Sequence, residues 1–250
     1  MKKTLKRILL GIGIIIVAIV LFFVGYMFKA KSETKGMTPV ATKQITDQIF
    51  SIQDSFANLY LMKDGDQYIA IDAGNNLDVV AGELKKLGIN PGNITAVLLT
   101  HTDGDHVGAI KLFTNAGIYL SANEAQMIDG RKSRFLFFGN KIDSKDYTLI
   151  ADQQIVKIGN VVIKGILTPG HTPGSMCYLM NDKYLFTGDL LSIKAGKIQK
   201  FNEFFNMDTK TAIQSIDRIV NIQACEYIFS AHYGYTNHYK NAVKDWKKQE

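Results

Sequence analysis

The stretch from Thr100 to Gly108 reads Thr-His-Thr-Asp-Gly-Asp-His-Val-Gly and places two histidines and two aspartates within six residues. The apolar run 94–99 precedes it and is typical of a buried strand. The stretch is therefore predicted to be a loop between a strand and a helix. Four such side chains crowded onto one loop would repel one another unless a positive charge lay among them, and a divalent cation is the simplest explanation. The rest of the chain must then supply the remaining ligands.

The excess of basic over acidic residues is confined to the first 35 residues of the chain. The 250 residues include 29 Lys and Arg and 23 Asp and Glu, a formal net charge of +6. Residues 1–35 hold seven of the basic residues and one of the acidic ones, which leaves 22 of each sign in residues 36–250. A body without net positive charge has no general electrostatic footprint for nucleic acid. The two cysteines form no CxxC pair, which excludes a zinc ribbon.

Residues 8–28 form one uncharged apolar segment, and four basic residues precede it. Such a segment is long enough to cross ~30 Å of hydrocarbon as a helix, and the basic residues predict that the N-terminus stays in the cytoplasm. A cleaved signal peptide is the alternative, but its apolar core would be shorter and would end at small residues. We therefore expect a single-pass protein of the cell membrane with four parts: a cytoplasmic N-terminus at 1–7, a transmembrane helix at 8–28, a juxtamembrane linker at 29–43 and an extracytoplasmic domain at 44–250.

The remainder of the chain reads as short strands interspersed with helices. Helical spacing of apolar residues is found over 77–87 and 209–222, and a further helix is expected from the loop at Thr100 to about Asn115. The predicted strands are 45–52, 57–62, 67–71, 94–99, 118–120, 147–150, 154–158, 161–167, 176–180, 184–186 and 227–230. Two halves, each of strands followed by a helix, predict an α/β domain in four layers with the order αββα.

Four of the five histidines stand in loops that follow predicted strands, beside Gly, Pro or Asp. These are His101, His106, His171 and His232, and His238 is the fifth. Asp72 and Asp189 occupy the same kind of position. One histidine in such a loop is commonly a plain surface residue, but random scatter would not gather four of five at strand ends. The pattern predicts a metal site.

The order of these residues resembles the five motifs of the metallo-β-lactamase-fold hydrolase superfamily. The motifs are Asp72, His101-x-Asp103-x-Asp105-His106, His171 within Gly-His-Thr-Pro-Gly-Ser, Asp189 within Thr-Gly-Asp, and His232 after a strand. The resemblance spans residues 44–235. It implies two stacked β-sheets flanked by helices, with a two-metal site at one edge.

The same resemblance assigns the candidate ligands. One ion would take His101, Asp103 and His171. The other would take Asp105, His106 and His232, and Asp189 would bridge the two ions. Asp105 would also take up a proton during catalysis, and Asp72 would support the loop through hydrogen bonds.

Asp103 departs from the family pattern, which carries a histidine at this place. A carboxylate adds negative charge and a hard oxygen ligand, so iron and manganese become alternatives to zinc. We expect two divalent ions and place zinc first. The resemblance then implies hydrolysis, because two ions a few ångströms apart generate hydroxide near neutral pH.

The Gly-His-Thr-Pro-Gly-Ser loop and Asp189 resemble those of the glyoxalase II and lactonase branches, which implies a small ester, thioester or lactone as substrate. Common zinc lactamases have cysteine in place of Asp189. A phosphodiesterase of the competence-protein type, whose loop also reads His-x-Asp-x-Asp-His, is the alternative. A diiron redox protein and a non-catalytic metal-binding module are further alternatives.

Two aromatic groups leave their roles open. The run Arg131-Lys132-Ser133-Arg134-Phe135-Leu136-Phe137-Phe138 would be a basic and aromatic flap if exposed and part of the core if buried. Phe201, Phe204 and Phe205 follow Asp189 and would form either an apolar lip of the site or ordinary packing.

Overall fold

A computed structural model of the chain describes residues 2–134, 139–142 and 146–246. Contacts between residues divide the chain into a first unit, Met1–Met37, and a main unit, Thr38–Glu250. Residues 135–138 of the aromatic and basic run lie outside the described residues, so its assignment as flap or core stays a prediction.

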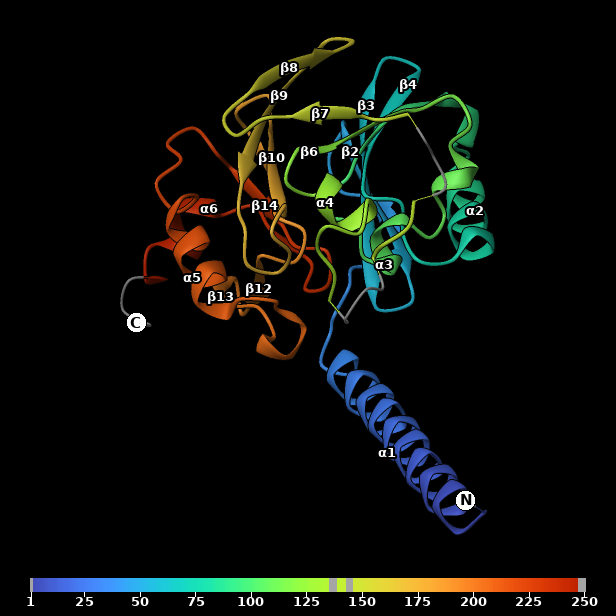
Figure 1. Cartoon of the computed structure of the whole chain (residues 1–250). Coiled ribbons are helices and arrows are strands. Elements are labelled where there is room, and N and C mark those ends of the chain that lie inside the picture. Colours follow the sequence, from blue (N-terminus) through green and yellow to red (C-terminus); the bar gives the residue numbers. More distant parts are fainter. Residues whose placement is uncertain (1, 135–138, 143–145, 247–250) are drawn as a thin grey trace. The chain divides into compact units, whose positions relative to one another are not determined.

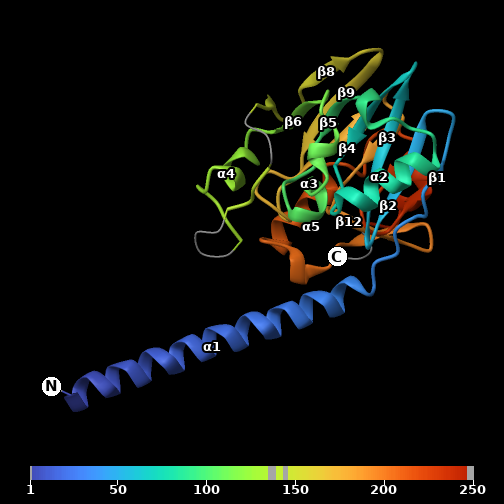
Figure 2. The ribbon, with the colours of Figure 1, turned by 90° about the vertical axis from the view of Figure 1, so that its right-hand side faces the viewer.

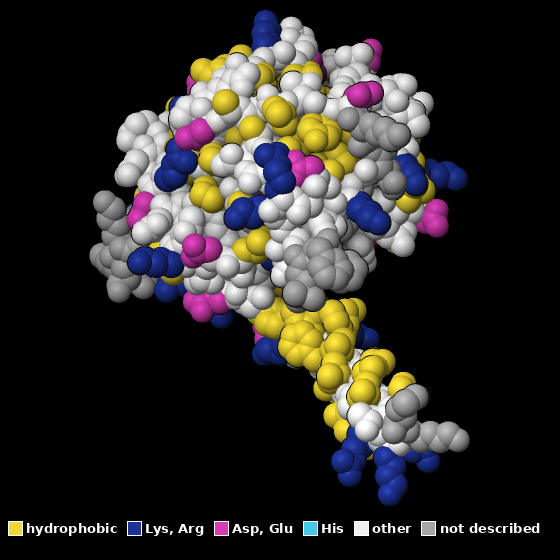
Figure 3. Space-filling model, viewed as in Figure 1, with side chains coloured by type: hydrophobic (Ala, Val, Ile, Leu, Met, Phe, Trp, Pro, Cys, Tyr) yellow, Lys and Arg dark blue, Asp and Glu magenta, His cyan; other side chains and the backbone are white. Residues whose placement is uncertain are grey.

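The first unit consists mainly of one unbroken helix, α1 (Lys2–Thr34) (Figures 1 and 2). It contains the whole apolar segment and continues into the predicted linker, where Lys29 and Glu33 form an ion pair one helical turn apart. Apolar side chains cover α1, and basic side chains gather at its amino-terminal end (Figure 3). By length and composition the helix could cross a membrane, a test that a signal sequence would also meet. Membrane anchoring and its orientation remain predictions.

The first sheet of the main unit contains seven strands in sequence order among the described residues. They are β1 (Lys43–Gln44), β2 (Ile49–Asp54), β3 (Ala57–Asp64), β4 (Gln67–Ile71), β5 (Ile94–Leu98), β6 (Gly117–Ser121) and β7 (Thr148–Ile150). Strands β1 to β4 form an antiparallel meander. From β4 to β7 the neighbours are parallel.

The second sheet has the order β15-β14-β11-β10-β9-β8. Its strands are β8 (Ile155–Ile158), β9 (Val161–Leu167), β10 (Met176–Met180), β11 (Tyr184–Phe186), β14 (Tyr227–Phe229) and β15 (Tyr235–Thr236). Only the β11–β14 pair among them is parallel. A separate hairpin is formed by β12 (Leu191–Lys194) and β13 (Lys197–Lys200).

Helices cover the outer face of each sheet (Figure 1). On the first sheet these are α2 (Leu77–Lys86) and α3 (Gly104–Val107), with α4 (Ala125–Ile128) nearby. On the second they are α5 (Thr209–Asp217) and α6 (Tyr239–Val243). This arrangement confirms the predicted four-layer αββα fold.

The alternation of side chains in β3 shows how the layers are held. Leu59 and Leu61 pack into the cluster that includes Val80 of α2. Tyr60 and Met62 point the other way, into the cluster shared with the second sheet. Because successive residues of a strand face opposite sides, a strand that is buried on both faces, as β3 is over most of its length, is mostly apolar.

The helix expected after the Thr100 loop is much shorter than predicted. It consists of α3 and a separate 3₁₀ turn, Ile110–Leu112. Gly108 lies between them, and its backbone N–H donates to the carbonyl of Gly74 at 2.7 Å. A Cβ atom on Gly108 would come within 2.1 Å of the Asn75 carbonyl oxygen. This close contact with the loop after β4 diverts the chain from a longer helix. The helix α5 is also shorter than predicted, because it ends at Asp217 and does not reach residue 222.

Candidate metal centre

All of the candidate ligands lie in segments that leave strands at one edge of the two sheets, Asp105 and His106 at the start of α3 and the others in loops. The loops follow β4 (Asp72), β5 (His101 to His106), β9 (His171), β11 (Asp189) and β14 (His232). Strands β4 and β5 are parallel, as are β11 and β14, while β9 and β11 are both antiparallel to β10. The carboxyl ends of these strands therefore meet at one edge of each sheet.

Hydrogen bonds between the sheets hold the two sets of loops together. Tyr178 on β10 donates its hydroxyl to the carbonyl of Leu99 at 2.8 Å. The backbone N–H of Met176 donates to the carbonyl of Thr100 at 2.9 Å. On the other side, the N–H of Asn58 donates to the carbonyl of Ala231 at 2.7 Å. These bonds attach the segment before His101 to β10 of the second sheet and the segment before His232 to β3 of the first.

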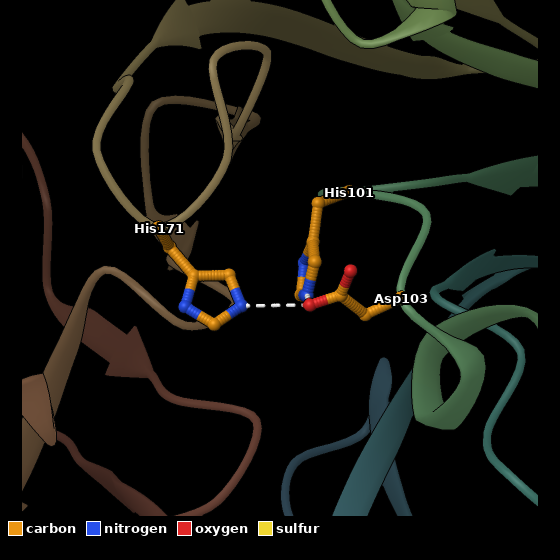
Figure 4. Close-up of side chains that lie close together, drawn as sticks. All are labelled: His101, Asp103 and His171. Atoms are coloured by element: carbon orange, nitrogen blue, oxygen red, sulfur yellow. Dashed lines mark hydrogen bonds and ion pairs between the residues drawn. The ribbon is translucent and has the colours of Figure 1, made fainter. Parts of the chain in front are cut away.

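One part of the site, here the Asp103 half, consists of His101, Asp103 and His171. Figure 4 shows the three side chains pointing toward one another. Asp103 Oδ2 lies 3.1 Å from His171 Nε2 and 3.5 Å from His101 Nε2. These three side chains could hold one metal ion.

The other part, here the Asp105 half, consists of Asp105, His106 and His232. Asp105 Oδ2 lies 3.6 Å from His106 Nε2 and 3.4 Å from His232 Nε2. The three could hold a second ion. The structure thus brings the candidate residues together in the two groups that the family resemblance implied, while their role as metal ligands stays a prediction.

Asp189 lies between the two halves and is buried. Its Oδ2 is 3.1 Å from His232 Nε2 and 3.5 Å from His171 Nε2. Its Oδ1 is 3.5 Å from His106 Nε2. Gly188, which precedes it, has φ +52°, and a Cβ there would lie 2.5 Å from Thr100 Oγ1. A glycine is therefore needed where the loop turns toward the site.

Hydrogen bonds at Nδ1 fix the protonation pattern of the two histidines in the Asp105 half. His106 Nδ1 lies 2.9 Å from Asp72 Oδ2, and a carboxylate only accepts. His232 Nδ1 lies 2.8 Å from the carbonyl oxygen of Phe56, which also only accepts. Both Nδ1 atoms must therefore carry protons, and in the neutral ring each Nε2 presents its lone pair to the site.

The same holds for the Asp103 half. The hydroxyl of Thr100 donates to Asp72, so it accepts from His101 Nδ1 at 3.1 Å. His171 Nδ1 faces the side-chain oxygen of Asn206 at 3.4 Å. Each of these histidines can then offer the lone pair of Nε2.

Acceptor atoms facing acceptor atoms indicate that this arrangement suits a cation. Among the described residues, the buried atoms His101 Nε2, His106 Nε2 and Asp189 Oδ1 have no hydrogen-bond partner. Ligands ~2.1 Å from a tetrahedral ion lie ~3.4 Å apart, and the separations of 3.4 and 3.6 Å between Asp105 Oδ2 and the two histidines of the Asp105 half agree with this value. The residues therefore fit a divalent metal.

The electrostatic surroundings of the buried side chains favour positive charge within the site. Burial alone would lower the pKa of His106, but Asp189, Asp72 and Asp105 raise it well above its usual range. Burial alone would raise the pKa of Asp189, but the imidazoles around it, His232 first, hold it well below its usual range. A metal ion bound here would supply positive charge in the same place, and it would displace the extra proton from His106.

Arg134 belongs to the site and was missed as a site residue in the sequence. Its Nη2 lies 2.5 Å from Asp103 Oδ2 and 2.9 Å from His171 Nε2, and its Nε donates to Asp103 Oδ1 at 3.1 Å. Arg134 and Asp103 are largely buried, with 19% and 18% of their side chains exposed. The basic and aromatic run containing Arg134 was the only signal, and it did not indicate where this side chain would point.

Glu124 is a second residue that the sequence did not indicate. It is fully buried, and its Oε1 accepts from the N–H and the hydroxyl of Thr102 at 2.7 Å each. Its Oε2 accepts from the hydroxyl of Thr172 at 2.6 Å. Glu124 thereby links the loops that carry His101 and His171, and burial raises its pKa.

Aromatic rings line one side of the site. The ring of Phe201 lies 5.3 Å from that of His171 and 5.9 Å from that of His232, and Phe201 is buried. Phe56 stacks on His232 at 5.7 Å. Phe201 therefore packs against the site. Phe205 belongs to the 3₁₀ turn Glu203–Phe205, and its ring centroid lies 6.4 Å from that of Phe201.

Comparisons with known proteins agree with the geometry. A family model described as the metallo-beta-lactamase superfamily matches residues 52–232. The probable polyketide biosynthesis zinc-dependent hydrolase BaeB of Bacillus velezensis is 33% identical over 124 residues, which cover 48% of this chain and 48% of the relative. The atrochrysone carboxyl ACP thioesterase of Aspergillus chevalieri is 24% identical over 159 residues, which cover 63% of this chain and 47% of the relative. The chain thus spans about half the length of these curated relatives.

Solved structures with the same fold are also found. One is described as the first B3 metallo-beta-lactamase with an active site glutamic acid; it matches with a TM-score of 0.66 and 19% identity over 88% of this chain and 91% of that one. A metallo-beta-lactamase family protein of Thermus thermophilus matches with a TM-score of 0.62 and 16% identity over 82% and 80%. At these identities the likeness concerns the fold.

Proposed function

The chain belongs to the metallo-beta-lactamase superfamily, and we propose that it is a metal-dependent hydrolase whose site lies at the common sheet edge. The proposed ligand set is His101, Asp103, Asp105, His106, His171, Asp189 and His232. The observation that carries the proposal is the convergence of four imidazole Nε2 atoms, each with a hydrogen-bond partner at Nδ1, on the carboxylates of the site. Acceptor atoms placed in this way repel one another unless a cation lies between them. The arrangement is the one expected of a site that binds a metal ion.

A divalent cation held there supplies a Lewis acid that polarises a carbonyl oxygen and lowers the pKa of water. Asp105 is the proposed proton acceptor because its side chain is 21% exposed, whereas that of Asp189 is 5% exposed. Asp105 can therefore reach a water molecule and release its proton to solvent. Asp72 and Glu124 keep the loops in place through the bonds described above.

Zinc is the proposed metal, since the Bacillus relative is named a zinc-dependent hydrolase. The proposed substrate is a small ester, thioester or lactone. Thioesters come first, because a further relative is named an ACP thioesterase. The aromatic rings of Phe201 and Phe205 at the site would suit an apolar acyl chain. We further propose that α1 anchors the enzyme in the cell membrane with the main unit outside the cytoplasm.

The experiment is to purify the full chain in detergent, measure bound metal, and assay thioester, ester, lactone and bis-nitrophenyl phosphate substrates. We expect acyl substrates to be turned over. The variants His106→Ala and Asp189→Ala should lose more activity than the ~10–100-fold caused by loss of a supporting partner, and should bind less metal. His238→Ala is the matched control, because His238 is exposed and outside the site. Near-normal turnover in either ligand variant, or turnover of the phosphodiester alone, would contradict the proposal.

A further inference from the structure

We propose that Arg134 competes with a divalent cation for the Asp103 half of the site, so that the chain binds one ion tightly in the Asp105 half and a second one only at much higher concentration. This inference rests on the proposed metal centre and concerns how its two halves differ. It follows from the atoms that Arg134 contacts, from the charge it carries and from the way it is held.

The first argument is that Arg134 uses the atoms a metal would use. A guanidinium only donates hydrogen bonds, so Asp103 Oδ2 and His171 Nε2 are both acceptors for Nη2. Those two acceptors lie 3.1 Å apart (Figure 4), a separation that is favourable only when a positive group lies beside both. An imidazole nitrogen has one lone pair. His171 Nε2 therefore accepts from Arg134 or binds a metal, but cannot do both.

The second argument is electrostatic. An ion ~2.1 Å from both acceptor atoms could lie no farther than ~4 Å from Arg134 Nη2. An arginine stays protonated in proteins, so it cannot relieve the repulsion by losing its charge. The guanidinium of Arg134 and the metal ion would both have to be neutralised by the single negative charge of Asp103. Arg134 must therefore move before a second ion can bind with ordinary affinity.

The third argument is that Arg134 is held in place. Its Nη1 donates to the carbonyl of Phe205 at 2.6 Å, and its Nη2 also donates to the carbonyl of His171 at 3.2 Å. Asp103 Oδ1 accepts from Arg134 Nε and from the amide of Asn140 at 3.0 Å. The Asp103 carboxylate is thus already satisfied by protein donors. Displacing the arginine would break this paired, charge-assisted arrangement.

The atoms around the Asp105 half differ in that no arginine is hydrogen-bonded to them among the described residues. Of the three buried acceptors in the site without a hydrogen-bond partner there, His101 Nε2 belongs to the Asp103 half, whereas His106 Nε2 and Asp189 Oδ1 face each other at 3.5 Å beside the Asp105 half. The first ion should bind here, where it satisfies unpartnered acceptors and displaces no protein group.

The experiment is a metal titration of the full chain in detergent after removal of bound metal with a chelator. Zn²⁺ binding is followed by calorimetry and Co²⁺ binding by its visible absorption, with metal content measured directly. We expect the wild type to bind one equivalent tightly and the second at least about tenfold more weakly. Arg134→Gln should tighten the second equivalent at least about tenfold and leave the first unchanged. Arg131→Gln is the matched control, since Arg131 pairs with Asp129 at the surface.

Two equivalents of equal affinity in the wild type would overturn the inference while leaving the metal centre intact. An unchanged second equivalent in Arg134→Gln would overturn it as well. If the wild type bound no metal, both the inference and the proposed function would fail. Thermal unfolding establishes that each variant is folded, and if Arg134→Gln does not fold, the wild-type stoichiometry still decides.

Discussion

Asp72 offers the most direct test of how the structure prepares a ligand. Its Oδ1 accepts from the backbone N–H of Thr100 at 2.7 Å, and its Oδ2 accepts from His106 Nδ1 at 2.9 Å. Asp72→Asn keeps the shape but replaces one oxygen with an NH₂ group. With the amide oxygen on the Thr100 N–H, the NH₂ group meets the proton on His106 Nδ1. Turning the amide round places the NH₂ group against the Thr100 N–H, so two donors meet in either orientation.

The contact between two donors is relieved at the lowest cost if the proton of His106 moves from Nδ1 to Nε2. That change places a hydrogen on the atom that faces Asp189 and Asp105, and it blocks the lone pair that would bind metal. Loss of such a supporting carboxylate typically lowers metal affinity ~10–100-fold, which corresponds to about 1.4–2.7 kcal/mol. We therefore expect Asp72→Asn to weaken the first metal equivalent by that factor, with a parallel loss of activity at limiting metal.

The assay is the same metal titration, with Asp54→Asn as control. Asp54 is also a buried aspartate near α2, and its Oδ2 accepts from the N–H groups of Asn75 and Asn76 at 2.6 Å each. An asparagine can keep its oxygen on both N–H groups and turn its NH₂ group toward the hydroxyl of Ser55. Asp54→Asn should therefore leave metal affinity unchanged. Equal metal affinity in Asp72→Asn and the wild type would refute the reasoning that the Asp72 bond fixes the proton on His106.

Two further predictions concern the scaffold and the first unit. A Cβ on Gly174 would lie 2.0 Å from the backbone nitrogen of Glu124. Gly174→Ala should therefore destabilise the protein by ~1–3 kcal/mol and lower its Tm by ~2–12 °C, measured by thermal unfolding. An unchanged Tm would show that the loops containing Gly174 and Glu124 are free to separate. A chain shortened to residues 38–250 should stay in solution without detergent and bind metal as the full chain does, because the two units are compact separately; a need for detergent would contradict this expectation.

The side chains that the structure brings together as candidate ligands could be picked out from the sequence because their identity and local position carry the signal. His101, His171 and His232 each come within four residues of the end of a strand, and the strand order then places the loops at one edge. The alternating and continuous apolar runs likewise predicted most strands, since both faces of β3 are buried. The predicted length of the helix after the Thr100 loop was wrong. The true length depends on the contact between Gly108 and Asn75, which local spacing does not encode.

Glu124 and Arg134 could not be predicted for a related reason. Glu124 contacts residues 22 and 48 positions away, and Arg134 contacts residues 31 and 37 positions away. No local motif surrounds either of them, and the run around Arg134 fits a flap and a core equally well. Their roles depend on how two loops from different sheets approach each other, which follows from packing and not from the pattern of neighbouring residues.

The departure at Asp103 and the arginine beside it are best understood as one feature. A histidine at position 103 would offer a single lone pair, which cannot accept the two parallel donors of Arg134, whereas a carboxylate accepts both. The charges favour the same conclusion. The positive charge of Arg134 offsets that of Asp103, which leaves Asp105 and Asp189 to one divalent ion. A second divalent ion would repel Arg134 unless the arginine withdrew. The position at which this chain differs from its family's usual ligand set is thus the position at which a protein cation takes the place of a metal cation.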